Sequence, residues 1–189
     1  SLNLDRPISL VVHDWGGLIG LSYATRYPNR VSRLVVLNST AFHVPKGKAL
    51  NPALLWCRES RLAPFVIQKL NFFSWAATHW GCAMHRMPRL IRKAYQFPYR
   101  HSSDRWAILR FIQDIPLCRE DFSYSEVSNI QAGLRKLRDK PMLLCWGEQD
   151  PVFDRDFLVE WQRRFPFAFV QKFTQGGHFI LEDIGETSV

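Results

Sequence analysis

The chain has 189 residues, of which 47% are hydrophobic, 14% aromatic and 22% charged. This is enough apolar material for a core, which excludes a disordered chain and a small disulfide-held scaffold. No apolar run approaches the ~18 residues that a membrane span needs. The four cysteines are far apart in the sequence and form no metal-binding or redox pair, as in reduced intracellular proteins. We therefore expect a cytoplasmic globular domain carrying an insertion, with no metal and no cofactor.

The net charge of +8 comes from 25 Lys and Arg against 17 Asp and Glu. Such a balance suits nucleic acid, an anionic membrane surface or anionic substrates. Many of the basic residues fall between Arg86 and Arg110, and Arg89, Arg92 and Lys93 share one side at helical spacing, which is typical of a solvated helix face. No zinc finger, helix-turn-helix or aromatic RNA-binding motif is present, so we expect no nucleic-acid partner.

The first forty residues alternate strand and helix. Residues 8–12 form a short β-branched apolar run, which predicts a strand buried on both faces. A helical pattern follows over residues 18–27 and is ended by Pro28. Residues 31–37 read as a second buried strand. This order predicts a parallel strand–helix–strand unit.

The pattern changes between residues 45 and 125, where short helical segments alternate with prolines and aromatic and basic residues become frequent. Strand and helix alternation then resumes, with expected elements at residues 126–137 (helix), 142–145 (strand), 157–165 (helix) and 169–173 (strand). We predict an α/β fold, a mainly parallel sheet flanked by helices with a helical cap insertion. The expected parts are the core at 1–44, the cap at 45–125 and the core again at 126–189.

One candidate catalytic side chain follows each of three predicted strands: Asp14, then Asp150, then His178. Ligands gather beyond the carboxyl ends of strands in an open parallel sheet. Nucleophile, acid and histidine in this chain order is the order of an α/β-hydrolase fold. Taken singly, Asp14 could cap the following helix, and the other two could be turn residues. Three together favour a catalytic site.

An Asp in the nucleophile position is chemically informative. A carboxylate can displace a leaving group at saturated carbon to give an ester, which water can hydrolyse; a serine would leave an inert ether. In this interpretation His178 activates the water and Asp150 orients its ring, while the backbone N–H of Trp15 stabilises an oxyanion and its indole N–H a leaving group. His13 is expected to support the turn. Asp154 and Asp156 are alternative acids, but they lie where the next helix begins.

Three motifs resemble the haloalkane dehalogenase and epoxide hydrolase branch of the α/β-hydrolases: Val-Val-His-Asp-Trp-Gly-Gly (11–17), Cys-Trp-Gly-Glu-Gln-Asp (145–150) and Gly-Gly-His-Phe-Ile-Leu-Glu-Asp (176–183). The cap motifs Arg-Lys-Ala-Tyr-Gln-Phe-Pro-Tyr (92–99) and Arg-Phe-Ile-Gln-Asp-Ile-Pro-Leu (110–117) look most like the β-lactone decarboxylases of bacterial long-chain olefin biosynthesis. The resemblance covers nearly the whole chain.

The resemblance implies a hydrophobic β-lactone substrate with two long alkyl chains, which loses carbon dioxide to give an internal alkene. It also implies Asp14 as nucleophile, with His178 and Asp150 completing a triad. Several cap aromatics are candidates to line an apolar tunnel, although packing within the cap explains them equally well: Trp56, Phe72, Phe73, Trp75 and Tyr95. A basic cap beside an oily substrate also fits docking to a membrane or to olefin-pathway enzymes, with the protein peripheral to the membrane.

Three alternatives stay open. A haloalkane dehalogenase would release an alcohol and needs a second halide donor. An epoxide hydrolase would release a diol and needs cap tyrosines, for which Tyr95, Tyr99 and Tyr124 are available. An inactive hydrolase-like binding module is the non-enzyme alternative. The family's first strands, with the loop that supplies a second oxyanion donor, have no counterpart in these residues. We therefore expect a partial α/β-hydrolase fold whose first strand is an unprotected edge, and a chain that alone aggregates or is inactive.

Overall fold

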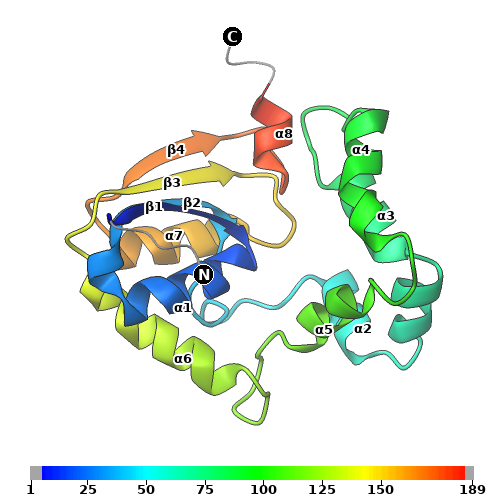
Figure 1. The fold of residues 1–189 in the computed structure, drawn as a ribbon, viewed down its shortest axis with the longest axis horizontal. Helices are drawn as coiled ribbons and strands as arrows, with labels where there is room; N and C mark the ends of the chain where they lie inside the picture. The colour runs from blue at the N-terminus through cyan, green and yellow to red at the C-terminus, as the bar shows by residue number, and fades with distance from the viewer. Residues whose placement is uncertain (1–5, 186–189) are drawn as a thin grey trace.

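The computed structural model describes residues 6–185 and contains a parallel four-stranded sheet (Figure 1). Its strands stand in sequence order, so that β1 and β4 are the two edges. Each neighbouring pair is parallel, and the carboxyl ends of all strands therefore meet at one side of the sheet. The strands are β1 (Ile8–Asp14), β2 (Val31–Ser39), β3 (Met142–Gly147) and β4 (Phe169–Phe173).

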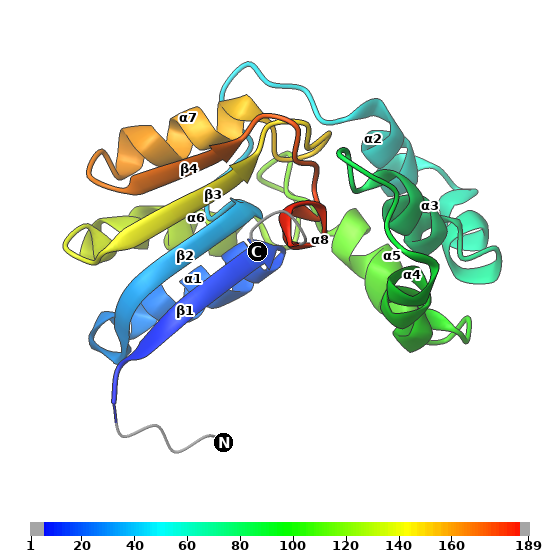
Figure 2. The same ribbon diagram turned by 90° about the horizontal axis from the view of Figure 1, so that it is seen from above.

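Most helices of the core lie on one side of this sheet, whereas α8 (Ile180–Ile184) and the cap lie beyond the carboxyl ends of the strands (Figures 1 and 2). The core helices are α1 (Gly16–Arg26), η1 (Pro28–Arg30), α6 (Tyr124–Gly133), η4 (Leu134–Leu137), α7 (Arg155–Arg164) and α8 (Ile180–Ile184). The cap helices are α2 (Pro52–Glu59), η2 (Phe65–Lys69), α3 (Phe72–Trp80), α4 (Arg89–Gln96), η3 (Phe97–Tyr99) and α5 (Trp106–Gln113).

The predicted α/β class and element order are confirmed, and the strand at residues 169–173 has the expected bounds. The helix expected at 126–137 is instead an α-helix that ends at Gly133 and a following 3₁₀ turn. The prolines of the cap mark helix starts, since Pro52 is the first residue of α2 and Pro88 precedes α4. The fixed φ of proline suits the first turn, where its missing N–H leaves no bond unmade.

The expectation that the strands are buried on both faces is wrong for β1 and β3, whereas residues 36–39 of β2 are buried on both faces. Along β3, Met142, Leu144 and Trp146 are buried against the helices, whereas Leu143 and Cys145 on the other face are only half-buried. At the edge, Val11 of β1 is 60% exposed. The reason is that α1, α6 and α7 cover the same face (Figure 1), so alternate residues of β1 and β3 keep contact with solvent. The predicted exposed edge at β1 is confirmed.

Two separate hydrophobic clusters hold the molecule together. The larger packs the covered sheet face against α1, α6 and α7, with Trp146 and Trp161 fully buried. Each indole donates to the backbone, Trp146 to the Phe153 carbonyl at 2.9 Å and Trp161 to the Ser39 carbonyl at 2.8 Å. Buried indoles need such partners, and these two fix the loops at the carboxyl ends of β3 and β2.

The cap has its own small core, formed by Ala63, Ile67, Leu109 and Ile112. Buried Arg105 ties the cap segments together by donating to four backbone carbonyls, those of Gln68, Lys69, Tyr99 and Arg100. A guanidinium has five donors in a fixed plane, which suits it to collecting several chain segments at once. No helix of the described residues is long and apolar enough to span a bilayer, and all four cysteines are unpaired.

Adjacent glycines at the start of α1 provide a matched test of the close approach between α1 and β2. A Cβ on Gly17 would lie 1.9 Å from Ser39 Oγ and 2.4 Å from the Thr40 carbonyl oxygen, whereas one on Gly16 would meet nothing within 4 Å. Only Gly17 therefore needs to lack a side chain for this close approach. We expect Gly17→Ala to lower the free energy of unfolding by about 2 kcal/mol or more and Gly16→Ala to change it little or raise it. Urea unfolding of both variants measures this; equal stabilities would contradict the packing described.

Candidate active site

Asp14 ends β1 in a strained backbone turn that leads directly into α1. Its φ is +49°, a left-handed value that is uncommon for a residue with a side chain. The Ser39 hydroxyl donates to the Asp14 carbonyl, and Asp14 pairs with Ser39 in the parallel ladder. The helix N-cap is Trp15, with no side-chain cap, so Asp14 is not a capping residue. The turn instead presents the carboxylate at the carboxyl edge of the sheet.

The three side chains predicted from the strand ends do meet. His178 Nδ1 lies 2.8 Å from Asp150 Oδ2, and His178 Nε2 lies 4.0 Å from Asp14 Oδ2. Asp150 is fully buried, and its Oδ1 accepts from the backbone N–H groups of Val152 and Phe153. The imidazole is thus held between a buried carboxylate and an accessible one, an arrangement that can move a proton at Nε2 while Asp150 fixes the ring.

The electrostatics of this pair favour a charged imidazole. Burial opposes the charge on His178, but the hydrogen bond and negative charge of Asp150, together with the charge of Asp14, outweigh it, so the pKa of His178 is raised above 6.5. Burial also opposes the charge of Asp150, yet the His178 bond and two backbone N–H groups keep the pKa of Asp150 below 3.8. Asp150 is therefore ionised in the folded protein at neutral pH.

The pKa of Asp14 is raised above 3.8, mainly because surrounding atoms displace water, while the nearby histidines oppose the shift. Its side chain is still 42% exposed, so solvent limits this effect. The backbone N–H of Trp15 favours the charged form. Asp14 is consequently a partly desolvated carboxyl group whose charged form is supported by the two histidines and the Trp15 N–H, and a carboxylate in such surroundings can serve as a nucleophile.

His13 supports the site from the residue before the turn, as predicted. Its Nε2 lies 2.9 Å from the His178 carbonyl oxygen, and the two rings are 4.7 Å apart. The pKa of His13 is lowered by burial and by the charge of His178. A neutral His13 can donate to that carbonyl and so fixes the backbone of the histidine loop.

Asp183 fastens the cap to the histidine loop, a role that sequence reasoning did not find. Its buried carboxylate accepts from the N–H groups of Gly177, Ala83 and Met84, at 2.7, 2.8 and 3.2 Å. The Phe179 N–H donates to the Gly81 carbonyl across the same junction. Because carboxylate–amide bonds are strong when buried, the cap segment after α3 and the loop that carries His178 form one connected unit.

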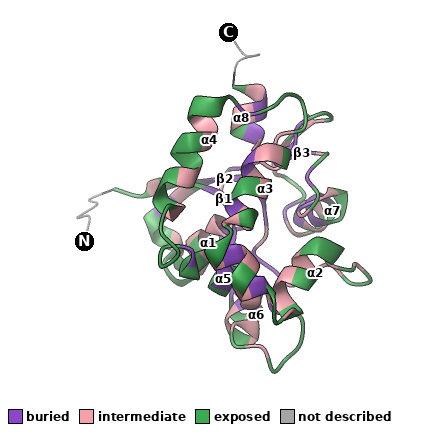
Figure 3. Cartoon of the chain, turned by 90° about the vertical axis from the view of Figure 1, so that its right-hand side faces the viewer, coloured by how far each residue is buried: buried purple, intermediate pink, exposed green. Residues whose placement is uncertain are grey.

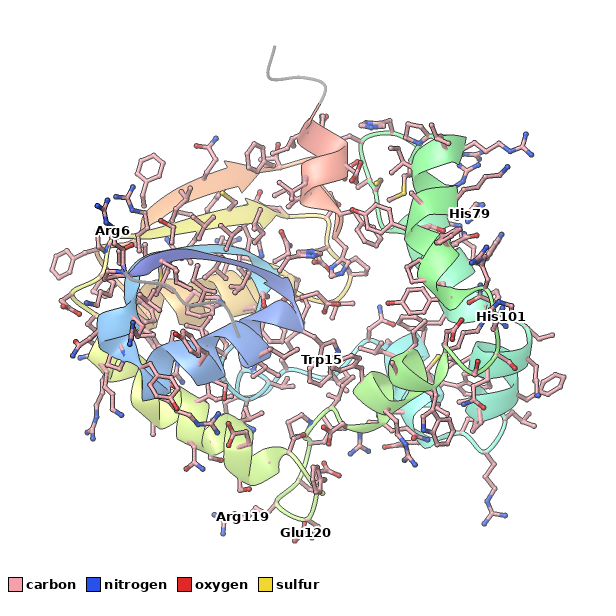
Figure 4. The ribbon with its side chains drawn as sticks, in the orientation of Figure 1. Arg6, Trp15, His79, His101, Arg119 and Glu120 are labelled. Atoms are coloured by element: carbon pink, nitrogen blue, oxygen red, sulfur yellow. The ribbon has the colours of Figure 1, made fainter. Side chains whose placement is uncertain are left out.

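The cap contacts the core from α5, beside the Asp14 turn, and from α4, at the segment that follows His178. The Trp15 ring packs 5.1 Å from that of Phe111 on α5, and Figure 4 shows Trp15 between the core and the cap. Tyr95 of α4 packs against Phe179, and its hydroxyl donates to Glu182 at 2.9 Å. Burial, followed by the Glu182 bond, raises the pKa of Tyr95 to about 12. The proposed oxyanion and leaving-group roles of Trp15 stay predictions.

The remaining candidate lining residues do not gather at Asp14. Phe73 packs on the small core of the cap, and Trp56 on α2 is half-exposed. Phe72 and Trp75 are exposed on the side of α3 that carries His79, which faces away from the sheet in Figure 4. Helical spacing turns Ser74 inward instead. Within the described residues, no group of three or more His, Cys, Asp or Glu side chains has the geometry to hold a metal.

These features define an α/β hydrolase, and the family's model, the alpha/beta hydrolase fold, matches residues 1–183. The chain belongs to this family. Asp154, one of the alternative acids, caps α7 by accepting from the Asp156 N–H, whereas Asp150 is the carboxylate bonded to His178.

Two curated bacterial relatives carry the name cis-3-alkyl-4-alkyloxetan-2-one decarboxylase. The Shewanella oneidensis protein is 47% identical over 98% of this chain and 58% of its own length. The Xanthomonas campestris protein is 37% identical over 100% of this chain and 62% of its own. Haloalkane dehalogenase 1 of Mycobacterium bovis is more distant, at 28% over 97% of this chain and 59% of its own. The chain thus spans about three fifths of these relatives, and the resemblance noted from its motifs is confirmed.

Solved haloalkane dehalogenases share the fold. DatA from Agrobacterium tumefaciens aligns with a TM-score of 0.80 at 22% identity, covering 96% of this chain and 63% of that one. DbeA from Bradyrhizobium elkani aligns with a TM-score of 0.80 at 20% identity, covering 96% and 64%. At these identities the likeness shows the fold alone.

The charge arrangement predicts the titration of the two site histidines. We expect NMR to give His178 a midpoint above 6.5 and His13 one below it, because His178 faces two carboxylates whereas His13 is buried and faces His178. A raised midpoint means that His178 stabilises the fold fully below pH 6.5 and that this contribution is lost as the pH rises through the midpoint. Asp150→Asn should lower the His178 midpoint; an unchanged midpoint would contradict the pairing.

Proposed function

We propose that this chain carries the catalytic site of a β-lactone decarboxylase that converts a cis-3,4-dialkyl oxetan-2-one to an internal alkene and carbon dioxide. The observation that carries the proposal is the carboxylate of Asp14, presented by a strained turn 4.0 Å from His178 Nε2. The names of the relatives at 47% and 37% identity support the substrate class. Asp14, His178 and Asp150 form the proposed triad.

The reaction needs two steps at Asp14. A carboxylate oxygen of Asp14 attacks C4 of the lactone, the saturated carbon bonded to the ring oxygen. The bond between C4 and the ring oxygen breaks, which leaves an Asp14 ester at C4 and a free carboxylate on C3. The C3–carboxylate bond then breaks, and its electron pair forms the C3=C4 double bond. The C4–O bond to Asp14 breaks at the same time and returns the free carboxylate. The products are carbon dioxide and the alkene, and no water is consumed.

His178 contributes charge and position in this scheme. Its raised pKa favours an imidazolium beside Asp14, which stabilises the carboxylate released from the ring. Asp150 keeps Nδ1 bonded, so Nε2 is the atom that faces the reacting groups. Hydrolysis of an alkyl ester, as in a haloalkane dehalogenase, would instead need a neutral His178 to activate water. Decarboxylation is therefore favoured by a protonated His178, whereas hydrolysis requires a neutral one.

The alternatives have less support. The haloalkane dehalogenase relatives are more distant than the decarboxylases. An epoxide hydrolase needs cap hydroxyls aimed at the nucleophile, but the Tyr95 hydroxyl is bonded to Glu182 and the Tyr124 ring stacks on His43. A binding module would have no need for a strained carboxylate paired with an oriented histidine.

The proposal is tested by supplying the complete protein with a cis-dialkyl β-lactone and measuring alkene and carbon dioxide. Asp14→Asn keeps the positive φ, which Asn tolerates, but removes the nucleophile; we expect turnover to fall about a thousandfold or more. Asp154→Asn is the matched control, because this carboxylate caps α7 away from the site, and it should keep its activity. Alkene formation by Asp14→Asn at the normal rate would overturn the proposal.

We further propose that residues 1–189 alone give little turnover in the same assay. The support is the uncovered sheet face and the free edge of β1, where Val11 is 60% exposed. Such an edge favours association between chains over a single folded state. Full activity of the isolated chain as a soluble monomer would contradict this.

A further inference from the structure

Helix α3 of the cap has its polar and apolar faces reversed. Ser74 and Thr78 are buried, with 6% and 3% exposure. In contrast, Phe72, Trp75 and Trp80 are 44%, 41% and 64% exposed. Large apolar side chains grouped on an outer face mark an interaction surface. We call these three residues the aromatic patch.

The aromatic patch is a continuous surface rather than three scattered rings. The Phe72 and Trp75 rings lie 5.7 Å apart, and Trp80 lies 5.3 Å from Trp75 and 6.2 Å from Phe72. Trp75 also stacks on His79 at 4.4 Å, and His79 points away from the sheet in Figure 4. Figure 3 looks onto the cap from this side, where α3 and α4 lie in front of the core. The patch is therefore outside the proposed active site.

The charge of the chain is concentrated around this patch. Residues 45–125 carry 13 Lys and Arg against 5 Asp and Glu, which equals the whole net charge of +8. Residues 60–103 contain seven Lys and Arg and no Asp or Glu. Helix α4 packs beside α3 and exposes Arg89 and Lys93, together with Leu90 at 77% exposure. Apolar and cationic groups are thus both exposed on these two neighbouring helices.

We propose that the aromatic patch and α4 dock on an anionic lipid surface. Tryptophan rings partition to the headgroup level of a bilayer, and Lys and Arg beside them bind acidic headgroups. The absence of any carboxylate from residues 60–103 removes the repulsion that an anionic surface would otherwise meet. A second copy of the chain is a poorer occupant, since a symmetric contact would bring the two cationic faces together. This inference does not depend on which reaction the active site performs.

The test is flotation of the complete protein with vesicles of phosphatidylcholine alone and of an equimolar mixture with phosphatidylglycerol. We expect binding to the anionic vesicles only, weakened as salt rises from about 0.1 M to about 0.5 M. Trp75→Ser combined with Trp80→Ser should weaken binding by about tenfold or more. The matched control is Phe122→Ser combined with Phe167→Ser, which removes two rings that are 94% and 96% exposed elsewhere and should bind as the unchanged protein does.

A second pair of variants tests the charge without touching the aromatic rings. Arg89→Glu with Lys93→Glu should abolish binding to anionic vesicles, whereas Arg135→Glu with Arg138→Glu, equally exposed on the core, should retain most of it. Absence of vesicle binding at about 0.1 M salt, or equal losses in patch and control variants, would overturn the proposal. A lower mass of the lipid-free protein in sedimentation, seen in the patch variants and not in the controls, would also overturn it. The patch would then be an interface between protein chains.

Discussion

The strained turn at Asp14 is the constraint on which the rest of the site depends. A residue with a side chain at φ +49° persists only when its surroundings hold it there. Three contacts do so: the ladder pairing of Asp14 with Ser39, the Ser39 hydroxyl on the Asp14 carbonyl, and the close approach of Gly17 to Ser39 and Thr40. Trp161 in turn binds the Ser39 carbonyl from the core. The fold thereby keeps a carboxylate, rather than a backbone group, at the end of β1.

The parallel pairing of the strands also positions the other two side chains of the site, Asp150 and His178. Since β1 to β4 stand in sequence order and run in the same direction, the loops after β3 and β4 open on the same side as Asp14. Asn38 at the end of β2 exchanges hydrogen bonds with Gly147 and so fixes where the loop to Asp150 begins. Asp183 then joins the histidine loop to the cap. The loop that carries His178 is therefore fixed by the cap as well as by the sheet.

The sheet and its three polar strand ends could be predicted from the sequence, because each apolar run and the polar residue that follows it are contiguous in the chain. Other features could not. Asp183 is one acidic residue in a helical turn, and only the fold brings Ala83 and Gly177 to it. The exposure of the aromatic residues on α3 could not be predicted either, because helical spacing alone does not say which face of a cap helix packs on the cap core. The exposure of Val11 depends on which helices cover the sheet, a tertiary property.

The most direct test of the account is to find the atom that forms the covalent bond. The complete protein carrying His178→Ala is incubated with a cis-dialkyl β-lactone and, separately, with a long-chain bromoalkane; it is quenched in acid, digested and mapped by mass spectrometry. The account predicts a lasting alkyl ester on the peptide that contains Asp14 after the bromoalkane, because hydrolysis of that ester needs His178. With the lactone it predicts alkene and carbon dioxide and only a short-lived ester, because the second step needs no water. Neither ester forms when Asp14→Asn is also present. Folded protein that gives no ester at Asp14 with either compound would contradict it.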